Sequence, residues 1–439
     1  MYFKSIEQQT NLHGSKISQL TVILTIITIS QINGIFALFI NHLSTINLIL
    51  IAKTFAGCED ILCDELEALG AENVRPLTRA VEFEGDLALM YKANLHCRTA
   101  LRILKPYATF EASDEEMLYN EIQNIDWTSL FTLDQTFAIN TTLNLSNLTH
   151  SQYVSLKAKD AIVDQFRDKY DDRPNVDIDQ PDLRIHLHIY QNVCTLSFDS
   201  SGESLHKRGY RDYTNQAPIN EALAAALVIK SGWDKKSSLA DFMCGSGTIL
   251  IEAAMIMRNI APNKYKSFFG FQTWKDYDAD LWKKIYSDAI KNELPASDTM
   301  IYGSDISGVV LDKARENIMN AGLEDSIKLK KGSFEKFKRP TDTGTLICNP
   351  PYGLRIEPKD ILDMYQRMGD TMKQQCKGWT CWIFTGNLEV AKFIGLRTTR
   401  KIQLYNGPIE CRYLRFDIYD GSKKKPKQID STEVKSEEN

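Results

Sequence analysis

The stretch from Asn349 to Tyr352 combines residue types that together suit the handling of an aromatic amine. It follows three apolar residues, Leu346–Cys348, which are typical of the end of a buried strand. Pro350 and Pro351 end that strand because a proline has no N–H to donate to a sheet. The side-chain oxygen of Asn349 and the carbonyl of Pro350 can accept both hydrogens of an exocyclic amine, and Tyr352 offers a ring face for stacking. Taken alone, the stretch is explained equally well as a surface turn.

A glycine turn and two acids form a second group that could bind a small molecule. Gly245 and Gly247 lie between a predicted strand and a predicted helix, where glycines let the backbone approach a ligand closely. Leu250 takes the place of the third glycine of a G-x-G-x-x-G motif, which argues against a nicotinamide cofactor. Asp305 is placed to accept from two ribose hydroxyls and Asp241 from an ammonium group. The group therefore predicts S-adenosyl-L-methionine, although each aspartate alone could cap the following helix.

Alternating strands and helices after residue 203 must bring these two groups together. We expect strands at 237–241, 300–305, 327–332, 345–348 and 379–384, a Pro-led helix at 218–230, helices at 309–321 and 361–376, an inserted helical segment at 258–298, and a closing pair of strands at 400–405 and 411–418. Repeated strand–helix units predict a parallel, doubly wound α/β sheet. Such sheets bind ligands beyond the carboxyl ends of their strands, where both groups of residues fall.

Residues 48–202 have a different pattern, which predicts an α+β region. The expected strands are 48–52, 80–84, 101–110 and 136–145, with a closing hairpin of 183–190 and 193–199; the expected helices are 58–69, 86–95, 115–126 and 151–170. Apolar residues of the first helix recur at helical spacing, and Gly70 follows as its expected C-cap. Strands and helices that alternate in this way suggest a small α+β sandwich.

Two groups of basic residues in this region are candidates for a nucleic-acid surface. They are Arg98, Arg102 and Lys105 on one run, and Lys157, Lys159, Arg167 and Lys169 on the long helix. Solvated faces carry such charges routinely, so the alternative of an ordinary surface stays open. The net charge of the chain is -5 and its pI is near 5.9, so any nucleic-acid contact must be confined to a local patch.

The cysteines and histidines do not form a recognisable metal site. The chain has 9 cysteines, and none belongs to a C-x-x-C pair, which favours reduced thiols over a disulfide framework or a zinc site. His186 and His188 alternate at strand spacing and could bind a metal, but no third ligand lies nearby. We therefore expect no metal.

Both ends of the chain differ from the rest. Residues 1–47 contain a run, 17–40, that is mostly apolar or small. A bilayer span needs ~20 predominantly apolar residues, so a membrane anchor is one interpretation; a signal and an extension without function are the others. The tail at 421–439 is expected to be disordered because lysines and acids dominate it.

Several of these motifs resemble one known family. The stretch 241–254, the strand that ends in Asp305 and the Asn-Pro-Pro-Tyr stretch resemble the class I amino-methyltransferases. Together with Leu205–Arg211, the Ala217-Pro218 pair and the preceding region, they resemble more narrowly the THUMP-containing RNA methyltransferases, in particular the guanine-N2 module of the large-subunit rRNA enzymes. The resemblance implies a ferredoxin-like segment at 48–97, a THUMP RNA-binding domain at 98–202 and a Rossmann-like methyltransferase domain at 203–420.

The resemblance also implies roles for single residues. The cofactor would be bound by Asp241, Cys244, Gly245, Gly247 and Asp305, and the target base by the residues from Asn349 to Tyr352. Two features depart from the family pattern. Residues 332–334 are Gly-Ser-Phe where many members have an acid, so the adenine contact there is open. A second methyltransferase half, fused to some bacterial members, is missing, so we expect one modification rather than two.

The expected function is methylation of an exocyclic base amine, guanine N2 of 23S rRNA, by a cytoplasmic enzyme without a protein partner. Methylation of tRNA guanine is an alternative because the catalytic motifs are shared. DNA adenine-N6 methylation also uses an Asn-Pro-Pro-Tyr site, but the RNA-binding resemblance argues against it. A non-catalytic RNA-binding protein is the remaining alternative, and the intact set from Asp241 to Tyr352 argues against that interpretation.

Overall fold

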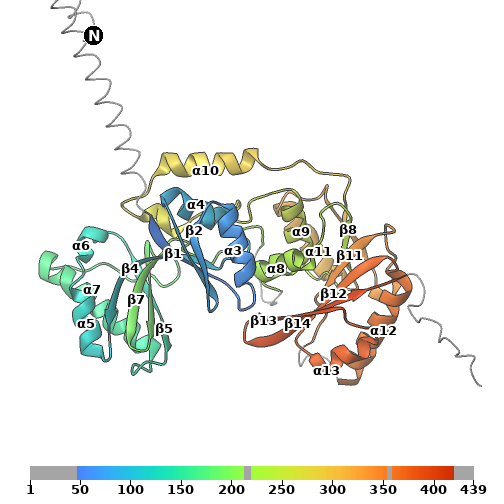
Figure 1. The fold of residues 1–439 in the computed structure, drawn as a ribbon. Coiled ribbons are helices and arrows are strands. Elements are labelled where there is room, and N and C mark those ends of the chain that lie inside the picture. The colour runs from blue at the N-terminus through green and yellow to red at the C-terminus, as the bar shows by residue number, and fades with distance from the viewer. Residues whose placement is uncertain (1–46, 212–218, 353–357, 420–439) are drawn as a thin grey trace, which may run out of the picture.

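The computed structural model describes residues 47–211, 219–352 and 358–419, and they form two seven-stranded sheets with helices packed against them (Figure 1). The first sheet belongs to the amino-terminal half and the second to the carboxyl-terminal half. Residues 1–46 and 420–439, including the apolar run at 17–40 and the expected tail, lie outside the described residues. Within the described part, no helix combines the length and apolar character needed to cross a bilayer.

The first sheet has the strand order β2-β3-β1-β4-β7-β6-β5. Its strands are β1 (Leu48–Lys53), β2 (Glu72–Leu77), β3 (Ala80–Gly85), β4 (Arg102–Glu111), β5 (Phe137–Asn144), β6 (Leu183–Tyr190) and β7 (Val193–Asp199). Its helices are α3 (Glu59–Ala68), α4 (Leu87–His96), α5 (Glu115–Gln123), α6 (Trp127–Leu130) and α7 (Ser151–Tyr170). Because β1 pairs with both β3 and β4, the sheet runs without a break across residue 98, where the sequence suggested a domain boundary.

The second sheet has the order β10-β9-β8-β11-β12-β14-β13. Its strands are β8 (Ser238–Asp241), β9 (Ile301–Asp305), β10 (Ile327–Lys331), β11 (Gly344–Cys348), β12 (Trp379–Thr385), β13 (Arg400–Asn406) and β14 (Ile409–Asp417). Strands β8 to β12 pair in parallel, and β14 pairs antiparallel with both β12 and β13. The chain therefore forms the expected doubly wound sheet, whose strand order reverses between β8 and β11.

Helices cover both faces of the second sheet. They are α8 (Glu221–Ser231), α9 (Thr248–Met257), α11 (Gly308–Asn320), α12 (Pro358–Gln375) and α13 (Leu388–Ala391), with short 3-10 turns η2 (Phe334–Lys336) and η3 (Lys392–Ile394). The inserted segment adds η1 (Gly270–Thr273) and α10 (Ala279–Lys291), which pack against the first half. One hydrophobic core joins α8, α9 and α11 to the face toward the first sheet, and another joins α12 and α13 to the outer face (Figure 1). Helices α8 and α9 are apolar on nearly all sides because both are enclosed.

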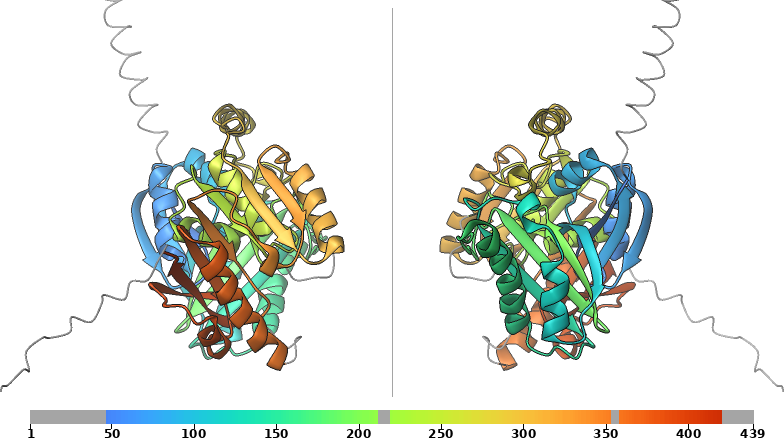
Figure 2. Two further views of the ribbon diagram at one scale, coloured as in Figure 1. Left: turned by 90° about the vertical axis from the view of Figure 1, so that its right-hand side faces the viewer. Right: turned by 90° about the vertical axis from the view of Figure 1, so that its left-hand side faces the viewer.

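The two halves share their cores. Phe55, Cys58 and Ile61 of the first half belong to the same buried cluster as α8 and α9. In the other direction, Phe269 and Phe271 of the inserted segment pack among residues of β1, β3 and α4. Helix α10 of that segment packs on α4 and lies at the top of the molecule in each view (Figure 1, Figure 2). The halves are therefore held together by apolar packing rather than by a linker alone.

Some expected elements differ from those observed. Strand β2 was not predicted, because Pro76 and its exposed polar residues hide an edge strand. The helix expected at 115–126 ends at Gln123, since Asp126 caps α6 instead. A helix was expected to begin at Pro218, which lies outside the described residues. The observed helix α8 begins at Glu221, because the Asn220 side chain accepts from the first-turn N–H groups.

Candidate active site

The carboxyl ends of β8, β9 and β11 bring the predicted site residues to one edge of the second sheet. Strand β8 pairs in parallel with β9 on one side and with β11 on the other. Three residues that are far apart in the chain therefore meet at the ends of neighbouring strands. Asp241 ends β8, Asp305 ends β9, and Asn349 directly follows β11. The strand order reverses at this point, which is where open α/β sheets form their ligand crevice.

The glycine turn needs backbone conformations that favour glycine. Gly245 and Gly247 have φ values of +55° and +84°, and the Cys244 N–H donates to the carbonyl of Ser304 at 3.0 Å. The turn ends at the start of α9, whose cap makes no side-chain hydrogen bond. From α11, the buried Asn317 donates its side-chain N–H to the carbonyl of Ser246 at 3.0 Å. The turn is thus held in place from the neighbouring strand–helix unit.

Asp305 connects the same two units through its carboxylate. Its Oδ2 accepts the Gly245 N–H at 3.1 Å, and its Oδ1 accepts the Ser307 N–H at 2.9 Å. The residue is only partly buried, and each carboxylate oxygen has a second lone pair. The structure therefore gives Asp305 a role in fixing the turn and leaves acceptor capacity for hydroxyl groups.

Asp241 is almost fully buried, with 2% of its surface exposed. Its Oδ1 accepts the Met243 N–H at 2.9 Å, and the Cys348 thiol also hydrogen-bonds to the carboxyl group. Burial is the main cause that raises the pKa of Asp241 to about 7, and the nearby Asp305 acts in the same direction. A cation bound beside this carboxyl would favour its charged form.

The thiol of Cys244, which the family resemblance placed among the cofactor-binding residues, offers little surface to a ligand. It is buried, and burial raises the pKa of the Cys244 thiol. A side chain at Gly303 would lie 3.2 Å from its sulfur, so Cys244 packs closely against β9. Its clearest observed contribution is the backbone hydrogen bond that positions the turn.

Asn349 presents a free acceptor at the end of β11. Its Oδ1 atom is buried and receives no hydrogen bond from any residue that the structure describes. Leaving a buried acceptor unsatisfied costs about 1–3 kcal/mol, so the feature needs an explanation. Pro350 is buried and Pro351 is exposed, so the chain turns outward directly after this acceptor. The arrangement is suited to receiving a donor from a substrate.

The ring of Tyr352 is held by residues of β12, of β13 and of the loop after β12. Its hydroxyl accepts from Asn406 Nδ2 at 2.8 Å, and its ring packs edge-to-face on Phe384 with centroids 6.3 Å apart. Partial burial raises the pKa of the Tyr352 hydroxyl. A side chain at Gly386 would come within 3.0 Å of the ring, so this glycine makes room for it. Sequence reasoning missed Asn406 and Gly386, because only the tertiary fold brings the end of β13 and the loop after β12 to Tyr352.

The cation-rich segment Leu205–Arg211 is mostly structural. Arg208, 1% exposed, lies 3.3 Å from Glu252 of α9, and the buried Arg211 pairs with Glu221 of α8 at 3.0 Å. Arg211 also donates to Thr248 at the start of α9. These ion pairs anchor the segment against the helices that carry the glycine turn.

The basic residues proposed as a nucleic-acid patch are largely committed to internal contacts. Arg98 donates to the carbonyl of Ile260 at 2.7 Å, Arg102 pairs with Asp199, and Lys105 pairs with Asp276 at 2.8 Å. Those on α7 make local contacts: Lys157 with the ring of Tyr119, Lys159 with Asp160, Arg167 with Asp164, and Lys169 with Thr128. Arg98 and Lys105 of the first group therefore join the two halves, which the sequence alone could not reveal.

No metal centre is found in the described part of the chain. No group of three or more His, Cys, Asp or Glu residues there is arranged to hold a metal ion. Burial lowers the pKa of His186 to about 4, which favours a neutral ring on the sheet. The cysteines are all free thiols.

Together, the fold and the site define a class I methyltransferase with an amino-terminal α+β region. Three domain families match in the expected order: the RlmL ferredoxin-like domain at residues 49–104, the THUMP domain at 112–199 and the RMKL-like methyltransferase domain at 208–415. Slr0064 of Synechocystis sp., named as an RNA methyltransferase, is 43% identical over 84% of this chain and 96% of its own length. The chain belongs to the THUMP-containing RNA methyltransferase family.

Two further comparisons agree with this membership. The ribosomal RNA large subunit methyltransferase K/L of Syntrophotalea carbinolica is 38% identical over 82% of this chain, which spans 52% of that protein. The crystal structure of SMU.472, described as a methyltransferase complexed with SAH, is 30% identical with a TM-score of 0.76; the match covers 86% of this chain and 99% of SMU.472. Methyltransferase activity thus fits both the fold and its relatives.

The observed donors and acceptors fit S-adenosyl-L-methionine. The buried Asp241 carboxyl suits an ammonium group, and Asp305 retains acceptor capacity for ribose hydroxyls. The glycine turn removes side chains from the space between them. Phe334, in the segment where the family pattern has an acid, is buried and its ring packs against Phe242.

Proposed function

We propose that this chain methylates the exocyclic N2 amine of a guanine in 23S rRNA, using S-adenosyl-L-methionine bound by Asp241, Cys244, Gly245, Gly247 and Asp305. The observation that carries the proposal is the buried, unsatisfied Oδ1 atom of Asn349 at the end of β11. It follows the strand next to the one that ends in Asp241. An acceptor in this position is what the reacting amine requires.

The chain's part in the reaction is to hold the amine. An exocyclic amine on a purine is a poor nucleophile because its lone pair is delocalised into the ring. Asn349 Oδ1 and the Pro350 carbonyl would accept its two hydrogens and favour a more tetrahedral nitrogen, with the lone pair directed at the methyl donor. Bound S-adenosyl-L-methionine supplies that electrophilic methyl group. Positioning of this kind can supply several kcal/mol, so no separate strong base is needed.

Tyr352 would hold the target base outside its helix. Stacking of a base on an aromatic ring is worth ~1–3 kcal/mol and offsets part of the cost of unstacking. Asn406 and Phe384 keep the ring in one orientation, so its stacking face is available without a loss of side-chain freedom.

The THUMP domain match and the name of the K/L relative support an rRNA substrate. A cytoplasmic location is proposed with that substrate. Methylation of a tRNA guanine and of a DNA adenine remain the competing outcomes, because both would use the same acceptors.

The test is methylation of RNA extracted from a strain that lacks the gene. Purified protein and labelled S-adenosyl-L-methionine are added to separated 23S rRNA, 16S rRNA, tRNA and genomic DNA, and the labelled nucleoside is identified by mass spectrometry. We expect N2-methylguanosine in 23S rRNA alone. Label in N6-methyladenine or in tRNA would contradict the proposed substrate, and absence of S-adenosyl-L-methionine binding by calorimetry would contradict catalysis itself.

A further inference from the structure

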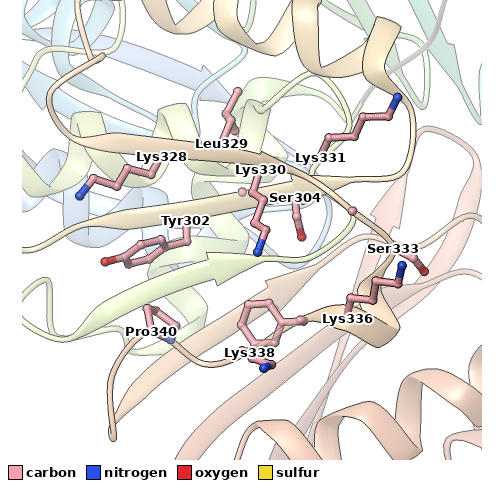
Figure 3. A pocket seen from close by; sticks show the side chains of 13 residues that line it. Tyr302, Ser304, Lys328, Leu329, Lys330, Lys331, Ser333, Lys336, Lys338 and Pro340 are labelled. Atoms are coloured by element: carbon pink, nitrogen blue, oxygen red, sulfur yellow. The ribbon is translucent and has the colours of Figure 1, made fainter.

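A lysine-lined cavity lies on the outer face of the second sheet, beside β9 and β10. Its volume is about 340 Å³, within the ~300–1,000 Å³ range of ligand sites. Five lysines line it, and none of the lining residues is an acid: Lys328, Lys330, Lys331, Lys336 and Lys338. The rest of the lining comes from β9 and from the loop between β10 and β11 (Figure 3).

The local fold explains why this face is open. Lys328 and Lys330 stand opposite Tyr302 and Ser304 in the parallel register of β10 and β9, so these side chains share one face. Leu329 points to the other face, where it packs against the core under α11 (Figure 3). The connection between β10 and β11, all of whose residues the structure describes, forms only the short turn η2 and a loop. No α-helix of this connection therefore covers the face.

No residue in the described part of the chain neutralises these lysines. No ion pair or side-chain hydrogen bond joins any of the five to another residue in the described ranges. This differs from the basic residues of β4 and α7, which have internal partners. Lys331 points with Leu329 toward α11, so four of the lysines gather on the cavity side (Figure 3). Without an ion-pair partner among the described residues, their like charges repel each other. The arrangement is therefore suited to an external anion.

The chemistry of the lining favours nucleic acid over the cofactor. S-adenosyl-L-methionine carries a cationic sulfonium and no phosphate, so lysines would repel its reactive end. Tyr302 and Phe337 add aromatic surface, and a positive groove with aromatic rings is the usual composition of a single-stranded nucleic-acid site. The cavity also adjoins the active-site edge, because Gly332 in its lining donates to the carbonyl of Asp305 at 3.0 Å.

We propose that this cavity binds the phosphate backbone of the RNA strand next to the target base. The proposal rests on the proposed function only for the identity of the RNA, since binding can be measured without methyl transfer. Lys328 and Lys330 on β10, with Lys336 and Lys338 on the facing loop, would contact phosphates, and Tyr302 would contact a base or ribose. The THUMP domain and this cavity would then hold the RNA on both sides of the reacting nucleotide.

The experiment compares two double variants of the full chain. Lys328→Ala/Lys330→Ala removes two charges from the cavity, and Lys313→Ala/Lys373→Ala removes two exposed charges from α11 and α12 as the matched control. Binding of a fluorescent single-stranded RNA oligonucleotide is measured by anisotropy over a range of salt concentrations. Circular dichroism and S-adenosyl-L-methionine titration confirm that each variant is folded.

We expect the cavity variant to bind RNA roughly ten- to thirtyfold more weakly at about 0.1 M salt. The slope of the logarithm of the binding constant against the logarithm of the salt concentration should be shallower by about 1.4, because two single-strand phosphate contacts are lost. The control should change affinity by less than about threefold. Lys328→Arg/Lys330→Arg should keep wild-type affinity because the charges remain. Equal losses in the cavity and control variants would overturn the proposal.

Further arms separate the source of the phosphate and the two proposals. ATP and pyrophosphate are added as competitors. If a free nucleotide binds the wild type through these lysines, and the cavity variant keeps its RNA affinity, the cavity is a mononucleotide site and the proposal is overturned. At saturating RNA, the cavity variant should keep its methyl-transfer rate. If wild-type protein transferred no methyl group but showed the lysine-dependent RNA affinity, the proposed reaction would fail and this inference would stand.

Discussion

Asn349 is the residue on which the proposed chemistry depends most directly. Its Oδ1 atom is buried, and no donor from the described residues satisfies it, whereas most buried polar atoms in proteins are paired. Burial also raises the pKa of the neighbouring Asp241 to about 7, because it disfavours the charged form of the carboxyl group. Both residues are therefore prepared to bind groups that the protein itself does not supply.

We expect Asn349→Ala to reduce methyl transfer by orders of magnitude, a loss of roughly 3 kcal/mol or more, by analogy with lost oxyanion-hole donors. Cofactor affinity should stay near the wild-type value, because the glycine turn and Asp305 are unchanged. Single-turnover rates measured beside S-adenosyl-L-methionine titrations check both parts. Asn349→Asp, which keeps an acceptor oxygen, is the matched variant and should retain more activity. A wild-type rate for Asn349→Ala would remove this residue from the mechanism.

Asp241→Asn should change stability in a pH-dependent way. The folded pKa of Asp241 is raised from 3.8 to about 7, so the folded protein holds this proton more tightly than the unfolded chain. The stabilising contribution is complete below about pH 4 and is lost as the pH rises to about 7. Above pH 7 the variant should therefore gain up to about 4 kcal/mol relative to the wild type.

Urea unfolding of both proteins between pH 4 and pH 8 measures this difference. The same variant should bind S-adenosyl-L-methionine poorly at every pH, since an amide cannot pair with an ammonium group as a carboxylate does. A stability difference that stays constant with pH would show that Asp241 does not titrate in this range.

At the scale of elements, the glycine turn depends on the strand–helix unit beside it. Asn317 of α11 donates to the carbonyl of Ser246, and the Asp305 carboxylate accepts the Gly245 N–H. The turn is therefore braced from two neighbouring positions. A change in α11 can alter cofactor binding without touching the cofactor.

Asn317→Ala should weaken S-adenosyl-L-methionine binding about three- to tenfold and reduce stability by about 1–2 kcal/mol, because it removes a buried hydrogen bond to the turn. Isothermal titration and urea unfolding measure the two effects. The control is Asn320→Ala on the same helix, whose side chain donates to the carbonyl of Tyr210, away from the turn. If both variants bind the cofactor equally well, α11 does not position the turn.

At the scale of the whole molecule, the two halves are joined by a shared core and a buried charge cluster. Arg208 lies within 3.3 Å of Glu252, donates to the carbonyl of Leu205 at 2.9 Å, and also donates to that of Arg98. Asn263 of the inserted segment completes the cluster. The residues come from both halves, so this cluster couples their stabilities.

Arg208→Ala should destabilise the protein by about 3–5 kcal/mol, because it leaves Glu252 as a buried charge without its partner. The double variant Arg208→Met/Glu252→Leu should recover much of this loss. Arg315→Ala, which breaks an exposed pair with Asp312, is the control and should change stability by less than about 1 kcal/mol. Urea unfolding followed by fluorescence measures all three; equal losses for Arg208→Ala and the double variant would contradict the account.

The sequence by itself determined the site motifs and the order of the elements. Asn349–Tyr352, the glycine turn and the strand-ending acids were recognisable because each has a local signature: prolines that stop a strand, glycines that allow a tight turn, and an apolar run before an acid. Helix α7 and strands β6 and β7 have the predicted bounds because their apolar periodicity is strong. The RNA methyltransferase family followed from these motifs as a set.

Only the tertiary structure decided which residues support them. Asn406 reaches Tyr352 from the end of β13, and Gly386 reaches it from the loop after β12. Asn317 reaches the turn across a helix packing contact, and no local pattern encodes these contacts. The structure also changes the interpretation of the charged residues. Arg98, which suggested an RNA patch, donates to a carbonyl of the other half, whereas Lys328 and Lys330 of β10 line an open cavity. The sequence shows that a residue is charged, but not whether it is buried or paired. Those properties depend on contacts with residues that are distant in the chain.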